Sequence, residues 1–345
     1  MDGPTNPLHK IKRLAALMAR HGEALLYVLT VIVPLIVRDR RRPVVFSRYT
    51  GMGDIICTIP AARELMKRHP CVTFIYNCHA DFADIPRLAG VADRVTSFQH
   101  IGLVGHRYGR LLAGFYHFAH GDDLPDGGCQ EPMVSEFCRQ FDLPVVEEHP
   151  ELPIVPAARQ RMLSLLADRN LNAGCLILIH AGPSWPVREW PREKWTQLVE
   201  ELRQRGYANI GQLGVGRYMN FGKVEVPVIP GAVSLLDTFT IEECIAAIAQ
   251  ATLFIGIDSG LLHIAASTRT PSVGIFGMTL PEYRFSATFR RDFVVNRVPC
   301  AGCEHRKPRL HWVTGCPYDI KCMKTLEMYD VLQACLAKLS PPVLR

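Results

Sequence analysis

The chain has 345 residues, and this length predicts two domains of ordinary size. Because 48% of the residues are hydrophobic and 21% are charged, the chain can bury a sizeable core, and its composition excludes a disordered protein. The formal net charge of +6 is carried by the first 48 residues, which hold nine Lys or Arg and three acids. The remaining chain is formally neutral. This excludes a nucleic-acid partner, because a nucleic-acid-binding domain carries its positive charge on its folded surface.

The first 42 residues combine an apolar run, residues 24–37, with basic residues on both sides. As a helix this run spans about 21 Å, which is shorter than a hydrocarbon core of about 30 Å, and Pro34 weakens a straight span. The basic stretch 38–42 stands where a signal peptide would have its cleavage site. We therefore interpret residues 8–42 as an in-plane anchor on an anionic membrane surface. The main alternative is a helix buried against the first domain, and a membrane span is the third.

The next segments alternate between strand and helix patterns. Residues 43–48 predict a first strand, 51–54 form a glycine-rich turn, 55–68 have helical spacing, and 71–76 predict a second strand. This alternation is typical of a parallel α/β sheet.

A proline-marked stretch, residues 148–156, is the predicted linker between two domains, 43–156 and 157–345. The second domain repeats the α/β pattern. Its predicted strands are residues 175–179, 208–213, 227–229, 253–257 and 272–276, and its predicted helices are 191–204, 242–250 and 259–267, with a further helix near the end of the chain.

Parallel α/β sheets bind ligands at the carboxyl ends of their strands, and three such corners carry unusual residues. The first corner is Gly51, Gly53 and Asp54. Two glycines allow a ligand to approach the backbone closely, and Asp54 then begins the following helix. Taken alone, Asp54 is also a normal helix N-cap.

The second corner is the loop from His180 to Pro191. Ser184 and Arg188 in this loop can bind an anion, since the arginine fork suits phosphate oxygens. The alternative is a solvated loop whose two tryptophans dock it on the domain.

The third corner is Asp258, Ser259, Gly260 and His263, where an apolar strand pattern meets a helix pattern. A helix that begins at Ser259 and Gly260 offers free N–H groups and the positive end of its dipole to a phosphate. Asp258 would repel a phosphate, so we expect it to orient the loop or to accept a hydroxyl hydrogen bond. His263 faces either the ligand or the core. Together the three corners indicate a nucleotide-sugar transferase of the GT-B type, with two facing Rossmann-like domains.

These motifs resemble glycosyltransferase family 9, the ADP-heptose:lipopolysaccharide heptosyltransferases and their relatives. The resemblance runs from about Val44 to Cys335, most of the chain. It is carried by three motifs in order, which begin at Gly51 (GMGDIICTIP), His180 (HAGPS, then REWP) and Asp258 (DSGLLHIAA, then FGMTLP).

The resemblance implies an inverting transfer from an ADP-sugar, with no cofactor required for catalysis. Asp54 matches the general base, Arg188 stands where the family's phosphate-binding lysine lies, and Ser184 and the Asp258 corner match the donor site. The chain departs from the family in two places. Arginine replaces lysine at 188, and residues 214–217 lack the acid that some members place near the ribose.

Twelve cysteines include a cluster with the spacing C-x₂-C-x₁₂-C-x₅-C, formed by Cys300, Cys303, Cys316 and Cys322. Four thiolates at such spacing can hold a structural zinc or iron ion, and the alternative is a set of reduced thiols that pack a loop. The other eight are interpreted as small buried hydrophobic residues in a reducing compartment.

We therefore expect a cytoplasmic enzyme, peripheral on the inner face of the bacterial inner membrane, that transfers heptose from ADP-heptose to the lipopolysaccharide core or a related membrane glycolipid. One alternative is a family 9 transferase with another nucleotide sugar or a protein acceptor. Another is a metal-ribbon binding protein on an inactive α/β scaffold.

Overall fold

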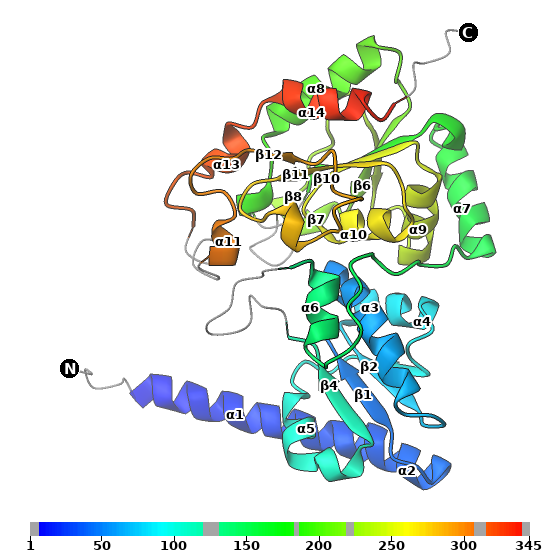
Figure 1. Ribbon diagram of the computed structural model, residues 1–345, viewed down its shortest axis with the longest axis vertical. Helices are drawn as coiled ribbons and strands as arrows, with labels where there is room; N and C mark the ends of the chain where they lie inside the picture. Colours follow the sequence, from blue (N-terminus) through cyan, green and yellow to red (C-terminus); the bar gives the residue numbers. More distant parts are fainter. Residues whose placement is uncertain (1–6, 120–130, 183–185, 219–223, 307–314, 340–345) are drawn as a thin grey trace. The chain divides into compact units, whose positions relative to one another are not determined.

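The computed structural model describes the backbone of residues 7–119, 131–182, 186–218, 224–306 and 315–339 (Figure 1). The chain divides into two compact units, residues 1–119 and 120–345. Each unit is an α/β structure built on a sheet of parallel strands, as the alternation of strand and helix patterns predicts. The boundary predicted at residue 156 lies within the second unit.

The first unit contains a four-stranded parallel sheet with the strand order β3-β2-β1-β4. Its strands are β1 (Val44–Ser47), β2 (Phe74–Asn77), β3 (Arg94–Thr96) and β4 (Gly114–His117), and its later helices are α3 (Met52–Lys67), α4 (Asp84–Leu88) and α5 (Gly102–Tyr108). Successive side chains of a strand point to opposite faces. On one face the Tyr76 hydroxyl lies 2.6 Å from Thr58 of α3. On the other face, Val45 and Ile75 pack in a cluster with Val104 of α5.

The amino-terminal helix consists of α1 (Pro7–Tyr27), a π-helical turn (Val28–Ile32) and α2 (Val33–Asp39). Its inner face belongs to the core of the first unit and contributes Ala24, Tyr27, Val28, Val31, Ile32 and Leu35. Its outer face is apolar but exposed, at Leu17, Met18, Leu25, Leu26, Leu29, Val33 and Val37. The helix Ala15–Asp39 is long and apolar enough to cross a membrane by length and composition alone, a test that core helices and signal sequences also pass. The inner face of the helix is therefore buried against the first unit, as the alternative of a helix buried against the first domain predicts.

The second unit contains a six-stranded parallel sheet with the order β12-β11-β10-β5-β6-β9, and a separate antiparallel pair, β7 and β8. The strands are β5 (Ile177–His180), β6 (Ile210–Gly214), β7 (Arg217–Tyr218), β8 (Val224–Glu225), β9 (Val233–Leu236), β10 (Leu253–Ile257), β11 (Ser272–Phe276) and β12 (Val294–Val295). The helices are α6 (Met133–Arg139), α7 (Pro156–Ala167), α8 (Arg192–Gln204), α9 (Ile241–Gln250), α10 (Gly260–Ser267), α11 (Cys303–Arg306), α13 (Lys321–Lys324) and α14 (Met328–Leu336).

One predicted strand, residues 227–229, is wrong. The edge position beside β6 is taken by β9 instead. The Gln212 side chain on β6 donates to Pro227 O (3.2 Å) and accepts from Ile229 N (2.7 Å). A proline lacks the N–H that a strand ladder needs, and here the side chain of Gln212 occupies the backbone groups of this segment.

The two faces of the six-stranded sheet are covered by different helices (Figure 1). Helices α8 and α14 pack over one face, where Trp195, Leu198 and Leu332 join the strand residues Ile179 and Ile255 in one buried cluster. Helices α7, α9 and α10 lie on the other side. Because all strands of this sheet are parallel, the carboxyl ends of β5, β10 and β11 lie at one edge. The loops that follow these ends carry the predicted site residues.

Candidate functional site

In the first unit, Asp54 lies in the first turn of α3, directly after β1 and the glycine turn. Gly51 has a φ of +84° and a Cβ at this position would lie 2.6 Å from Asp54 Oδ2, so a side chain here would strain the backbone and clash with the carboxylate. Gly53 is buried in the same turn. Gly51 thus makes room for the Asp54 carboxylate, and the predicted approach of a ligand to this turn stays a prediction.

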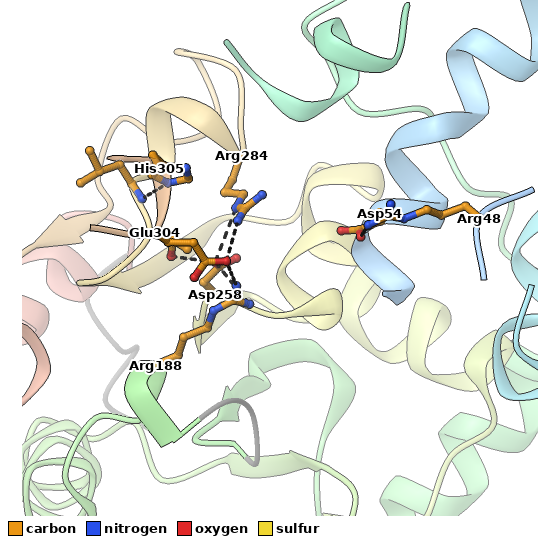
Figure 2. A network of polar contacts seen from close by, with 9 residues as sticks. Arg48, Asp54, Arg188, Asp258, Arg284, Glu304 and His305 are labelled. Carbon is orange, nitrogen blue, oxygen red and sulfur yellow. Dashed lines mark hydrogen bonds and ion pairs between the residues drawn. The ribbon is translucent and has the colours of Figure 1, made fainter. Parts of the chain in front are cut away.

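Arg48, the residue that follows β1, donates from Nη2 to Asp54 Oδ2 and from Nη1 to Phe118 O (3.1 Å; Figure 2). The ion pair is largely shielded, with side-chain exposures of 12% for Arg48 and 23% for Asp54. The N-cap of α3 is Gly51, so Asp54 stands inside the first turn, and the N-cap alternative for Asp54 is wrong. Asp54 is therefore oriented by the guanidinium of Arg48, a residue that the sequence analysis considered only as part of the net charge.

In the second unit, Arg188 ends a short 3₁₀ turn (Pro186–Arg188) after β5. Ser184 lies outside the described residues. Trp190 is buried, and its indole donates to Leu326 O at 3.1 Å. The ring also packs edge-on against Trp195 at a centroid distance of 5.3 Å. The loop is thus docked on the domain through Trp190, and the Arg188 side chain is only 15% exposed.

Arg188 meets Asp258, which follows β10 and is 3% exposed. The distance between Arg188 Nη1 and Asp258 Oδ2 is 3.6 Å, and Thr279 after β11 donates to the same oxygen at 2.7 Å. Burial by itself raises the pKa of Asp258, but the charges of Arg188, Arg284 and His263 and the Thr279 hydrogen bond lower it to about 2. Asp258 is therefore an ionised, buried counter-ion.

Two residues that the sequence analysis missed complete this network (Figure 2). Arg284 Nε lies 3.7 Å from Asp258 Oδ2. Glu304 Oε1 lies 3.4 Å from Arg188 Nη2 and 3.8 Å from Arg284 Nη2. Two guanidiniums thus share two carboxylates in a buried place. The sequence signal for Glu304 was its position next to Cys303, a residue already singled out.

Two polar atoms at this corner have no hydrogen-bond partner among the described residues, although both are buried. They are Arg188 Nε and Ser259 Oγ. Ser259 is the N-cap of α10 but makes no side-chain cap bond, and Gly260 begins the helix. Buried polar groups are normally paired, so two such donors beside a helix N-terminus are suited to a bound anion.

His263 in the first turn of α10 is 3% exposed and takes part in a histidine pair. Its Nδ1 lies 2.7 Å from Nε2 of His149, and its ring lies 4.6 Å from that of Phe285. His149 comes from the predicted linker, and the sequence analysis did not select it. The pair fastens the 148–156 segment to α10.

The four cysteines of the cluster interact electrostatically. Burial raises the pKa of Cys303 to about 11, and charges on Cys300, Cys316 and Glu304 add to the effect. Burial likewise raises the pKa of Cys322 to about 12, and the other three cysteines add to it. The four thiols thus influence one another electrostatically, but among the described residues no three of them lie close enough together to form a ready-made metal site.

The structure thus brings Arg188, Asp258, Ser259, Gly260 and His263 to one edge of the second sheet, with Arg284 and Glu304 added. Gly51, Gly53 and Asp54 form a separate group in the first unit. The second-unit group can bind an anion between guanidiniums and a helix end, and the first-unit carboxylate can accept a proton.

Comparison with known proteins gives a consistent family. The family model described as "Glycosyltransferase family 9 (heptosyltransferase)" matches residues 100–313. Lipopolysaccharide heptosyltransferase 1 of Pseudomonas aeruginosa is 26% identical over 306 residues, which cover 75% of this chain and 85% of that protein.

Two solved structures have a similar fold. The dodecameric iron-containing heptosyltransferase TibC, in complex with ADP-D-β-D-heptose, has a TM-score of 0.65 at 19% identity and covers 86% of this chain and 76% of its own. The ADP-heptose lipopolysaccharide heptosyltransferase II of E. coli has a TM-score of 0.61 at 14% identity and covers 86% and 98%. At these identities the likeness establishes the fold.

Proposed function

Because the chain belongs to glycosyltransferase family 9, the heptosyltransferase family, we propose that it transfers heptose from ADP-heptose to the lipopolysaccharide core. The α/β architecture agrees with the GT-B heptosyltransferases. The lipopolysaccharide enzyme of Pseudomonas aeruginosa supports the acceptor class, and the two structural neighbours, whose names include ADP-heptose, support the donor. Neither of the alternative functions is favoured by these comparisons.

The observation that carries the donor assignment is the pair of unpartnered buried donors, Arg188 Nε and Ser259 Oγ, within the described part of the chain. We assign the donor diphosphate to this place. It would lie at the N-terminus of α10, where the helix dipole and the backbone N–H groups favour negative charge. Arg188 and Arg284 would stabilise the charge that develops on the leaving ADP.

Asp54 is assigned as the general base. Its carboxylate would take the proton of an acceptor hydroxyl while that oxygen bonds to the anomeric carbon and the bond from that carbon to the diphosphate breaks. Arg48 would hold the carboxylate in place through its ion pair. Inversion at the anomeric carbon follows from this single displacement.

The four cysteines are proposed as the ligands of one structural zinc or iron ion. The chemistry of the donor set fits, because burial and the neighbouring thiols raise the pKa of Cys303 and Cys322, and a bound cation would stabilise their thiolates. TibC is described as iron-containing, which supports iron as the first candidate. The ion would hold the four cysteines together.

The outer face of the amino-terminal helix is proposed to lie on an anionic membrane, where a glycolipid acceptor is anchored. Its exposed apolar residues are followed by exposed arginines, and Arg40, Arg41 and Arg42 line an open groove with Ile36, Val72, Leu112 and Ala113. Apolar residues beside clustered arginines suit the headgroup region of anionic lipid. This supports a peripheral position on the cytoplasmic face of the inner membrane.

The direct test is transfer in vitro with the full chain. Purified protein is incubated with ADP-heptose and heptose-deficient lipopolysaccharide, and mass spectrometry should find a lipid that is heavier by one heptose, with ADP released in equal amount. ADP-glucose and UDP-glucose serve as donor controls. Transfer to a protein, or from another nucleotide sugar alone, would contradict the proposal and support the second family 9 function.

A further inference from the structure

The cysteine segment, residues 300–306, lies against the chain that leaves β11 (Figure 2). Gly302 N donates to Gly277 O at 2.9 Å, and Glu304 N donates to Met278 O at 3.1 Å. One residue further on, Leu280 N donates to His305 Nε2 at 2.9 Å. Three hydrogen bonds thus join the segment to residues 277–280, one of which, Thr279, binds Asp258.

Glycines allow this contact to be very close. A Cβ at Gly277 would lie 2.8 Å from Sγ of Cys322, and one at Gly302, where φ is +70°, would lie 2.5 Å from Leu280 Cδ1. Residues 277–280 are therefore packed between two parts of the cysteine cluster. A change in the cluster must move Glu304 or the chain that holds Asp258, because close packing transmits small shifts.

The charges in this network balance, and the ion pairs between them are long. Two guanidiniums face two carboxylates at 3.4–3.8 Å. Charge-assisted hydrogen bonds are shorter, at about 2.7–2.9 Å. The two guanidiniums are thus neutralised by Asp258 and Glu304, and Arg188 Nε has no hydrogen-bond partner among the described residues.

We propose that Glu304 is a positioning residue that occupies the two donor-site arginines until the nucleotide diphosphate takes its place. The cysteine segment, residues 300–306, sets how firmly Glu304 holds these arginines. This rests on the proposed function, which puts the diphosphate beside Arg188. Glu304 and a diphosphate are both negative and compete for the same guanidiniums, so Glu304 lowers nucleotide affinity and assists product release.

The first test is calorimetric titration of the full chain with ADP. Glu304→Gln keeps the shape and removes the charge, and it should bind ADP about fivefold or more tightly than the parent chain, since one competing charge is gone. Glu304→Asp, which keeps the charge, should remain within about twofold of the parent. Glu200→Gln, an exposed residue of α8 in the same unit, is the matched control and should change nothing.

The outcomes separate the two proposals. If the parent chain binds ADP and Glu304→Gln binds it equally or more weakly, the role of Glu304 is overturned and the donor site stands. If the parent chain binds no ADP, the donor site itself is overturned, and the inference with it.

The second test asks whether the cysteines act through Glu304. The double variant Cys300→Ser/Cys303→Ser should shift ADP affinity in the same direction as Glu304→Gln. Adding Glu304→Gln to the double variant should change the affinity little further, because the effects of substitutions at coupled residues are not additive. Unchanged affinity, or full additivity, would remove the cysteine segment from the proposal.

Hydrogen–deuterium exchange of the parent chain is a measurement that needs no variant to fold. ADP should alter the exchange of residues 302–306 as well as protect residues 258–262, because Glu304 loses its arginine partners. If ADP protects residues 258–262 but does not change residues 302–306, the proposal that the diphosphate replaces Glu304 at the arginines is overturned.

Discussion

The guanidinium of Arg188 lies 3.6 Å from the carboxylate of Asp258, so a loop residue after β5 and the residue that follows β10 share one buried charge network. Removing Arg188 takes away one of the two guanidiniums that neutralise Asp258 and Glu304, and the negative charge left on these carboxylates repels a diphosphate. We expect Arg188→Ala to weaken ADP binding by about 2–4 kcal/mol in calorimetry. Arg188→Lys should recover part of the loss, because it restores the charge without the fork.

The matched control for Arg188 is Arg192→Ala in α8, whose exposed guanidinium donates to Val228 O. It should bind ADP as the parent chain does. Unchanged ADP affinity in Arg188→Ala would show that the diphosphate does not use this residue.

Asp54→Asn tests the general base. Asparagine keeps the size of the side chain and an oxygen that can accept the bond from Arg48, but it cannot take a proton at neutral pH. Turnover should fall about 100-fold or more while ADP affinity stays constant, as measured by steady-state kinetics and calorimetry. Asp81→Asn, at an exposed acid of the same unit, should keep full turnover. If Asp54→Asn also turns over normally, Asp54 only stabilises α3.

The His149–His263 pair predicts a pH dependence of stability. Burial first, and the positive charge of His263 second, lower the pKa of His149 well below its ordinary value of 6.5. A group whose folded-state pKa is lowered contributes stability that is present above its unfolded pKa and lost as the pH falls toward the folded one. The thermal unfolding midpoint should therefore decrease as the pH is lowered from about 7 to about 5.

His149→Phe removes this titration and keeps an aromatic ring beside Phe285, which lies 5.1 Å from the native ring. Its unfolding midpoint should depend less on pH over the same range. His79→Phe, at a histidine that is 43% exposed, should keep the parent dependence. Parallel curves for the parent and His149→Phe would refute a proton-linked role.

The amino-terminal helix must be tested on its outer face, because deletion would remove six core residues of the first unit. A triple variant, Leu25→Gln, Leu26→Gln and Leu29→Gln, should keep the parent unfolding midpoint within a few degrees and lose most binding to anionic liposomes in flotation assays. High salt should release the parent only partly, since the apolar contribution is insensitive to salt.

The matched control is Ile154→Gln, an exposed apolar residue of the second unit that is 44% exposed, which should bind liposomes normally. A parent chain that does not float with anionic liposomes would make the outer face irrelevant to membranes.

The four-cysteine cluster predicts a bound metal. Elemental analysis of tag-free protein should find close to one equivalent of zinc or iron, and Cys316→Ser/Cys322→Ser should lose it and unfold at a lower temperature. Cys175→Ser should keep the metal. Cys175 lies outside the cluster and is exposed, so its interpretation as a buried residue was wrong. Less than about a tenth of an equivalent in the parent would favour the packed-thiol interpretation.

Local features of this protein follow from its sequence. The apolar run at 253–257 followed by Asp258-Ser-Gly predicts a strand, a corner and a helix start, and β10 and α10 lie there. The Gly51 turn before α3 follows the same logic. Such corners can be predicted from the sequence because hydrophobic periodicity and glycine preferences act over a few neighbouring residues.

The partners of these corners were decided only by the tertiary structure. The local sequence does not indicate that Arg284, Glu304 and His149 belong to the site. They meet Asp258, Arg188 and His263 only after the sheet and its loops have packed. The same holds for β9, which displaced the strand predicted at 227–229 because the Gln212 side chain occupies that segment. Contacts between distant residues depend on which buried charges and backbone groups can be satisfied together, and that balance is a property of the folded chain as a whole.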